Sequence, residues 1–64
     1  MKRAKLLKQL RKHGCHLLRE GGRHSVWMNP ATNVKEAIPR HNEIKTRLAH
    51  KICANLGVEP PKEA

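Results

Sequence analysis

The sequence predicts a small α+β domain with the element order α-β-β-β-α, in which two helices cover one face of a three-stranded antiparallel sheet. Both ends of the chain carry apolar residues at helical spacing, whereas the middle carries short stretches in which apolar and polar residues alternate. The connections between these short stretches are brief enough for hairpins, which join antiparallel strands. The two apolar helix stripes then share one core, and the opposite face of the sheet stays open for a ligand.

The first helix is predicted over residues 2–13. Leu6, Leu7 and Leu10 recur at steps of three and four residues, and basic side chains fill the other face of the helix. Basic residues in the last turn suit the negative end of the helix dipole. Gly14 is suited to end this helix, because glycine adopts the left-handed conformation that follows many helices.

Three strands are predicted, over residues 15–20, 23–29 and 34–38. Gly21 and Gly22 form the first connection and are interpreted as a two-residue hairpin turn, because glycine adopts positive φ without a steric penalty. Residues 30–33 form the second turn, and Pro39 ends the third strand. The strands are too short to show which face is the core, because a shift of one residue inverts every assignment.

The last helix is predicted over residues 47–56, with Thr46 as its N-cap and Asn42 as an alternative, earlier start. Leu48, Ile52 and Leu56 recur at four-residue steps and, together with Ala49 and Cys53, indicate its buried stripe. The chain is therefore interpreted as one domain over residues 1–58. The tail, residues 59–64, has no apolar anchor and is expected to be disordered.

Charge is the strongest compositional signal. The 64 residues include 14 Lys and Arg against 5 Asp and Glu, a net charge of +9. This excess favours a polyanionic partner or an acidic protein that covers the basic surface, and it does not distinguish RNA from DNA.

No apolar run has the length of a membrane span or a signal peptide, so we expect a cytoplasmic protein that does not bind membranes. Cys15 and Cys53 are expected to be buried free thiols.

Several motifs then carry a family resemblance. They are Gly14 before the first strand, Gly21-Gly22 closely followed by His24, Pro39-Arg40-His41 before Glu43-Ile44, and Leu56-Gly57-Val58 at the end. In this order and spacing the chain resembles a HicA-type (YcfA/HicA-like) toxin, the mRNA interferase of a bacterial type II toxin–antitoxin system. The resemblance runs from about residue 2 to residue 58.

The resemblance implies a fold like that of double-stranded-RNA-binding domains, translation-independent mRNA cleavage and a role in stress response. It also implies neutralisation by a cognate HicB-type antitoxin, and it requires no stable homo-oligomer. The family's catalytic histidine corresponds to His24. The chain departs from the family at Cys15, where many members have an aromatic residue, and at Arg23, where many have Ser or Gly.

The chemistry of RNA cleavage also favours His24 as the catalytic residue. RNA carries its own nucleophile, the 2′-hydroxyl, so cleavage requires a base, an acid and positive charge around the phosphorus. Histidine serves as base or acid near neutral pH, because its unperturbed pKa is about 6.5. His24 follows a glycine turn that has no side chains to shield it. The candidates for RNA binding are Arg23, Lys35, Arg40, His41 and Lys45.

Some alternatives stay open. His41 is either a second acid–base group or a structural hydrogen-bonding residue, and Trp27 either stacks on a base, faces the antitoxin or belongs to the core. No cofactor or metal is expected, because no His or Cys pair has the spacing of a structural metal site. A non-catalytic basic RNA-binding module is the alternative function, and His24 distinguishes the two because binding alone does not require it. A DNA-binding repressor is less well supported, since no helix-turn-helix is present.

Overall fold

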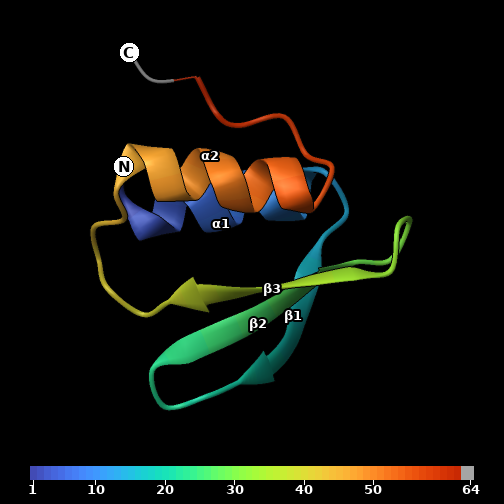
Figure 1. Cartoon of the computed structure of the whole chain (residues 1–64), viewed down its shortest axis with the longest axis horizontal. Coiled ribbons are helices and arrows are strands. Elements are labelled where there is room, and N and C mark those ends of the chain that lie inside the picture. The colour runs from blue at the N-terminus through green and yellow to red at the C-terminus, as the bar shows by residue number, and fades with distance from the viewer. Residues whose placement is uncertain (63–64) are drawn as a thin grey trace.

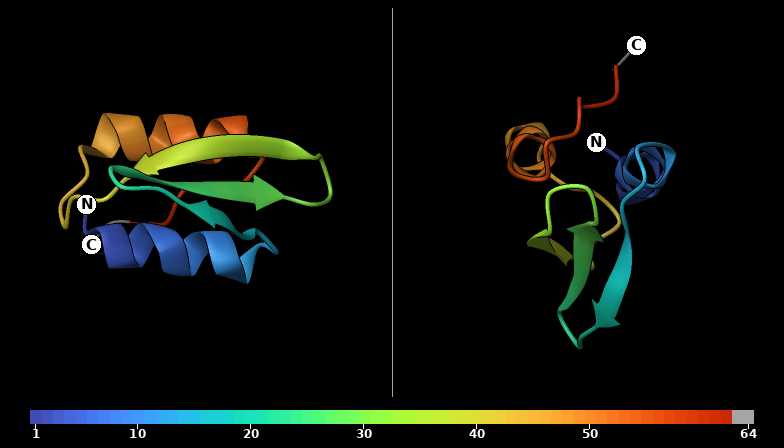
Figure 2. Two further views of the ribbon diagram at one scale, coloured as in Figure 1. Left: turned by 90° about the horizontal axis from the view of Figure 1, so that it is seen from below. Right: turned by 90° about the vertical axis from the view of Figure 1, so that its right-hand side faces the viewer.

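The computed structural model describes residues 1–62 and contains two helices and three strands in the predicted order (Figure 1). The elements are α1 (Arg3–Lys12), β1 (His16–Glu20), β2 (His24–Asn29), β3 (Val34–Pro39) and α2 (Thr46–Asn55). Strand β2 lies in the middle of the sheet and pairs antiparallel with both neighbours. Both helices lie on the same side of this sheet (Figure 2), so the predicted fold class is confirmed.

Strand β2 shows which face of the sheet is the core. Ser25 and Trp27 are buried, whereas Val26 and Met28, which alternate with them, are only half-buried. Because successive strand residues point to opposite faces, the buried pair faces the helices. The face that carries Val26 and Met28, here called the free face, lies opposite the helices and is seen in the left panel of Figure 2.

Trp27 belongs to the core, with only 2% of its surface exposed. The Arg11 guanidinium of α1 lies 5.1 Å from the centre of its ring, a cation–π distance. The alternatives that Trp27 stacks on a base or faces an antitoxin are therefore wrong. Its position follows from the large apolar area of the indole, which the small core needs.

The two helices bury the expected apolar stripes, except that Leu48 of the α2 stripe is exposed. Leu6, Leu7 and Leu10 of α1 are buried as predicted. In α2 the buried residues are Ala49, Ile52 and Cys53. Leu48 is 38% exposed, because the helix is rotated so that its smaller neighbour Ala49 faces the sheet.

The start and the end of α2 can also be compared with the predicted helix. Lys45 occupies the N-cap position and makes no side-chain capping hydrogen bond, so the prediction that Thr46 is the N-cap is wrong. The helix begins one residue earlier than expected. At the other end Gly57 has a φ of 72°, the left-handed conformation that reverses the chain after a helix. Val58 then returns to the core and is 4% exposed.

Strand β1 is an edge strand with an irregular register. Leu17 lies opposite Trp27, and Arg19 lies opposite Val26, so Leu18 is an extra residue in β1. Leu17 and Leu18 are 44% and 46% exposed, which makes β1 the least covered strand of the sheet.

The described part of the tail runs past α1. The Gln9 side-chain amide donates a hydrogen bond of 2.6 Å to the Glu59 carbonyl oxygen. Residues 63–64 lie outside the described residues, and the disorder of the tail stays a prediction. Within residues 1–62, neither helix has the length and apolar character needed to cross a membrane.

Candidate functional site

The end of the β1–β2 hairpin forms a hollow with the end of β3. Its lining consists of Gly22, Arg23, His24, Pro39, Arg40 and His41. Four residues that the sequence singled out for catalysis or RNA binding therefore meet at one place. They come from two segments that are far apart in the sequence and are joined by the pairing of β2 with β3.

His24 is exposed at the start of β2, directly opposite Pro39 in β3. Its neighbour Ser25 is buried against the helices, so strand alternation places the His24 side chain on the free face. The histidine is thus held on a paired strand rather than on a loose loop. A bulky substrate can approach it from the side opposite the helices.

The β1–β2 turn differs from the two-residue turn that the sequence predicts. Three residues, Gly21 to Arg23, separate the strands, and neither glycine adopts a positive φ. The requirement for glycine arises instead from close backbone contact at Gly21. Its N–H donates a 2.8 Å hydrogen bond to the His24 carbonyl oxygen, and an added Cβ would lie 2.8 Å from that same oxygen.

Arg40 connects the β1–β2 turn to the end of β3 through two hydrogen bonds. Its backbone N–H donates to the Arg23 carbonyl oxygen at 3.2 Å, and its Nη1 donates to the Gly21 carbonyl oxygen at 3.1 Å. Its Nε lies 3.6 Å from a carboxylate oxygen of Glu20. A phosphate that binds Arg40 therefore competes with Glu20 for this guanidinium.

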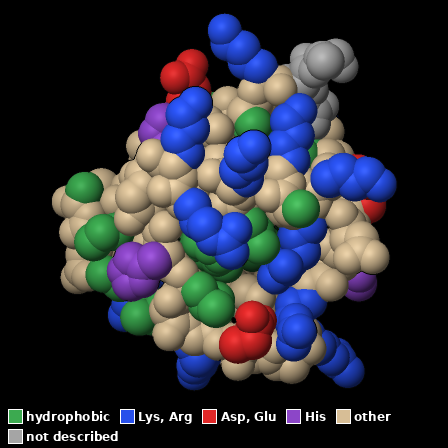
Figure 3. Space-filling model, turned by 180° about the vertical axis from the view of Figure 1, so that it is seen from behind, with side chains coloured by type: hydrophobic (Ala, Val, Ile, Leu, Met, Phe, Trp, Pro, Cys, Tyr) green, Lys and Arg blue, Asp and Glu red, His purple; other side chains and the backbone are tan. Residues whose placement is uncertain are grey.

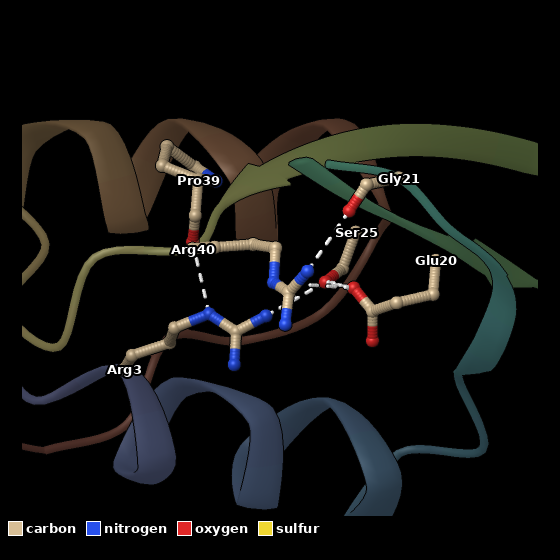
Figure 4. A network of polar contacts seen from close by, with 6 residues as sticks. All are labelled: Arg3, Glu20, Gly21, Ser25, Pro39 and Arg40. Atoms are coloured by element: carbon tan, nitrogen blue, oxygen red, sulfur yellow. Dashed lines mark hydrogen bonds and ion pairs between the residues drawn. The ribbon is translucent and has the colours of Figure 1, made fainter. Parts of the chain in front are cut away.

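Further polar contacts lie on the helix side of the same strands (Figure 4). Arg3 of α1 donates from Nε to the Pro39 carbonyl oxygen at 2.9 Å and from Nη2 to Ser25 Oγ at 2.7 Å. The Ser25 hydroxyl in turn donates to the Glu20 carboxylate. The sequence analysis did not identify this network. Its one local sign is that Ser25 alternates with Trp27 and therefore shares its face of β2; once that face is known to be buried, the hydroxyl needs partners.

Two predicted RNA-binding residues lie away from the hollow. Lys35 is opposite Met28, four positions along β3 from Pro39, which corresponds to about 13 Å of strand. Lys45 precedes α2 and is exposed. Both are surface cations, and neither lines the hollow around His24.

Most of the positive charge of the described residues is not neutralised. Of the Lys and Arg side chains in residues 1–62, only Lys2 and Arg40 form ion pairs with a carboxylate. Lys and Arg side chains spread across the face of the molecule that carries α1 (Figure 3). Unpaired positive charge of this kind favours the binding of polyanions in general.

The two cysteines do not contribute to the site. Both are free and buried, as predicted. Burial raises the pKa of the Cys15 thiol, and burial together with the neighbouring Cys15 raises the pKa of the Cys53 thiol. Both therefore stay protonated and weakly nucleophilic at neutral pH. Within residues 1–62, no three His, Cys, Asp or Glu side chains come together as potential metal ligands.

Comparison with known families identifies one match. The model of the HicA toxin of bacterial toxin–antitoxin systems matches residues 3–58, which includes both helices, all three strands and the hollow around His24. Searches of the curated proteins and of the solved structures find no match to this chain.

Proposed function

The chain belongs to the HicA toxin family of bacterial toxin–antitoxin systems, and on this premise we propose that it is an endoribonuclease that cleaves mRNA with His24 as its catalytic base. The observation that carries the proposal is the meeting of His24 with Arg23, Arg40 and His41 in one exposed hollow. A histidine next to cations is the constellation that phosphodiester cleavage through the 2′-hydroxyl requires.

In the proposed reaction, His24 accepts the proton of the 2′-hydroxyl as its oxygen attacks the adjacent phosphorus. The bond from phosphorus to the 5′ oxygen breaks, and that oxygen receives a proton from an acid. His41 is the candidate acid, because it lines the same hollow. Arg23 and Arg40 stabilise the negative charge that develops on the phosphoryl oxygens. The products are a 2′,3′-cyclic phosphate and a free 5′-hydroxyl.

His24→Ala tests the catalytic assignment. The side chain is exposed, so its removal opens no core cavity, and we expect the variant to keep its circular dichroism spectrum and melting temperature. Loss of general base catalysis lowers the cleavage rate of a synthetic RNA by a factor of about 10² or more. A folded variant that cuts RNA at the original rate removes His24 from the mechanism. A wild-type chain that binds RNA without cutting it supports the alternative, a non-catalytic RNA-binding module.

The proposed scheme needs no metal ion, because the nucleophile belongs to the substrate. We therefore expect undiminished cleavage in excess EDTA, with products that end in a cyclic phosphate or a 3′-phosphate. Product ends are read by mass spectrometry of a short RNA. Loss of cleavage in EDTA that Mg²⁺ or Zn²⁺ restores contradicts this scheme.

Membership of a toxin–antitoxin family implies an antitoxin partner. We propose that this antitoxin is of the HicB type and covers the hollow around His24 together with the neighbouring free face. Acidic residues on the antitoxin would face Arg23 and Lys45, which are exposed. Apolar contacts come from Val26 and Met28, since Trp27 is buried in the core.

A further inference from the structure

We propose that Arg3, Ser25 and Glu20 are positioning residues that hold His24 in its reactive place from the helix side of the sheet. This inference rests on the proposed nuclease function. None of the three side chains lines the hollow. Their hydrogen bonds hold the backbone segments that flank His24, and the position of that backbone sets the orientation of the imidazole.

Arg3 holds both strands at the level of His24. Pro39 is the residue opposite His24 in the sheet, and its carbonyl oxygen accepts a hydrogen bond from Arg3 Nε. Ser25 directly follows His24, and its hydroxyl oxygen accepts a hydrogen bond from Arg3 Nη2. One guanidinium thus spans the two strands, and its planar donors fix their separation better than a lysine ammonium does.

Ser25 carries the network from Arg3 to the turn. It is 1% exposed, accepts from Arg3 and donates to the Glu20 carboxylate, so its hydroxyl is satisfied on both sides. Glu20 in turn lies beside Arg40, which donates to the Gly21 carbonyl oxygen. Gly21 completes the path by donating to the carbonyl oxygen of His24. The contacts therefore reach the residue after His24, the turn before it and the residue opposite it; Figure 4 shows those among the six residues that it draws, which do not include His24.

A contribution to folding stability does not by itself explain why a serine occupies position 25. The neighbouring core positions of the sheet carry Trp27 and Ile38, which are buried apolar side chains. A buried polar network adds little net stability over apolar residues of similar shape, because its groups must first lose their hydration. What such a network does provide is a single defined geometry. A catalytic base needs that geometry, since a misplacement of about 1 Å lowers a rate by up to about 10²-fold.

Ser25→Ala is the direct test, and Asn29→Ala is its matched control. Asn29 is also a buried polar residue of β2, and its side chain donates to the Leu56 carbonyl oxygen at 2.7 Å, at the end of the strand away from His24. We expect both variants to melt at lower temperature. Under single-turnover conditions well below both melting temperatures, only Ser25→Ala slows cleavage, by about 10- to 100-fold. The affinity of both variants for a non-cleavable 2′-O-methyl RNA stays within twofold of the wild type.

Arg3→Lys provides the second variant, in case Ser25→Ala does not fold. Lysine keeps the charge but cannot make both hydrogen bonds in the same geometry, so the same selective loss of rate is expected. Equal cleavage rates for the wild type and the folded Ser25→Ala or Arg3→Lys variant overturn the positioning role. Equal slowing by Asn29→Ala overturns it too, because the loss then reflects general destabilisation. The His24→Ala variant is measured in parallel, and its full activity would refute the proposed catalytic base rather than the network.

Discussion

Gly21 and Gly22 are neighbours in one turn, but their backbone surroundings differ. A Cβ at Gly21 would lie 2.8 Å from the His24 carbonyl oxygen, whereas nothing lies within 4 Å of a Cβ at Gly22. Gly21→Ala must therefore displace the backbone of the candidate base. We expect it to cost about 1–3 kcal/mol of stability, as overpacking does, and to slow RNA cleavage. Gly22→Ala is the control for stability and should leave it nearly unchanged, because an added Cβ there meets no neighbouring atom; equal losses of stability in the two variants would contradict this account. Urea unfolding followed by Trp27 fluorescence measures the stabilities.

Ionisation of the Cys53 thiol is expected to lower the free energy of unfolding at alkaline pH. Burial, and then the neighbouring Cys15, raises its pKa above the usual value of 9.0. The unfolded thiol ionises at lower pH than the folded one, so its contribution to stability is present below about pH 9 and decreases above it. We expect the free energy of unfolding to fall more steeply between pH 8 and pH 11 in the wild type than in Cys53→Ala. Parallel curves for the two chains would show that the thiol stays accessible to water.

At the scale of the elements, the rotation of α2 decides which of its apolar residues stabilise the fold. Ile52 is 2% exposed and Leu48 is 38% exposed, although both belong to the stripe expected from the sequence. We expect Ile52→Ala to cost about 2–4 kcal/mol, because it leaves a cavity in the core. Leu48→Ala should cost less than about 1 kcal/mol, since much of its surface is already in water. Chemical denaturation of both variants checks the rotation, and similar losses would contradict it.

At the scale of the whole molecule, the net charge of +9 determines how RNA binding responds to salt. If six to ten phosphates are contacted, affinity falls by about 10³–10⁵ between 50 and 200 mM salt, because each contact releases counterions. We expect such a decrease for a non-cleavable 2′-O-methyl RNA measured by fluorescence anisotropy. A peptide nucleic acid of the same base sequence has no backbone charge and serves as the control. If the affinities for the RNA and for the peptide nucleic acid fall equally little with salt, phosphate contacts are not the main source of affinity.

The proposed antitoxin complex should respond to salt differently. Contacts with Val26 and Met28 bury apolar area, which salt does not screen. We expect the affinity for a cognate acidic antitoxin to fall much less than the affinity for RNA over the same salt range. If both affinities fall in parallel, the antitoxin acts by charge neutralisation alone and the apolar contacts are not part of the interface.

The sequence by itself determined the order of the elements and the candidate base. Periodicity is a local property, so the α1 stripe of Leu6, Leu7 and Leu10 and the end of α2 at Gly57 were readable without any knowledge of packing. The motifs likewise indicated His24 and the family, and the family model confirms the family. The catalytic role of His24 stays a prediction.

Tertiary structure alone decided which face of the sheet is buried and which distant groups meet. The strands are short, and a one-residue shift reverses their faces, so only the packed sheet assigns Trp27 to the core. In the same way, Leu48 and Ala49 were both expected on the buried side of α2, and only the packed helix shows that Ala49 is buried and Leu48 is exposed. The contacts of Arg3 with Ser25 and Pro39 join residues 22 and 36 positions apart in the chain. No local pattern records such a contact, because it exists only after the helix has packed on the sheet.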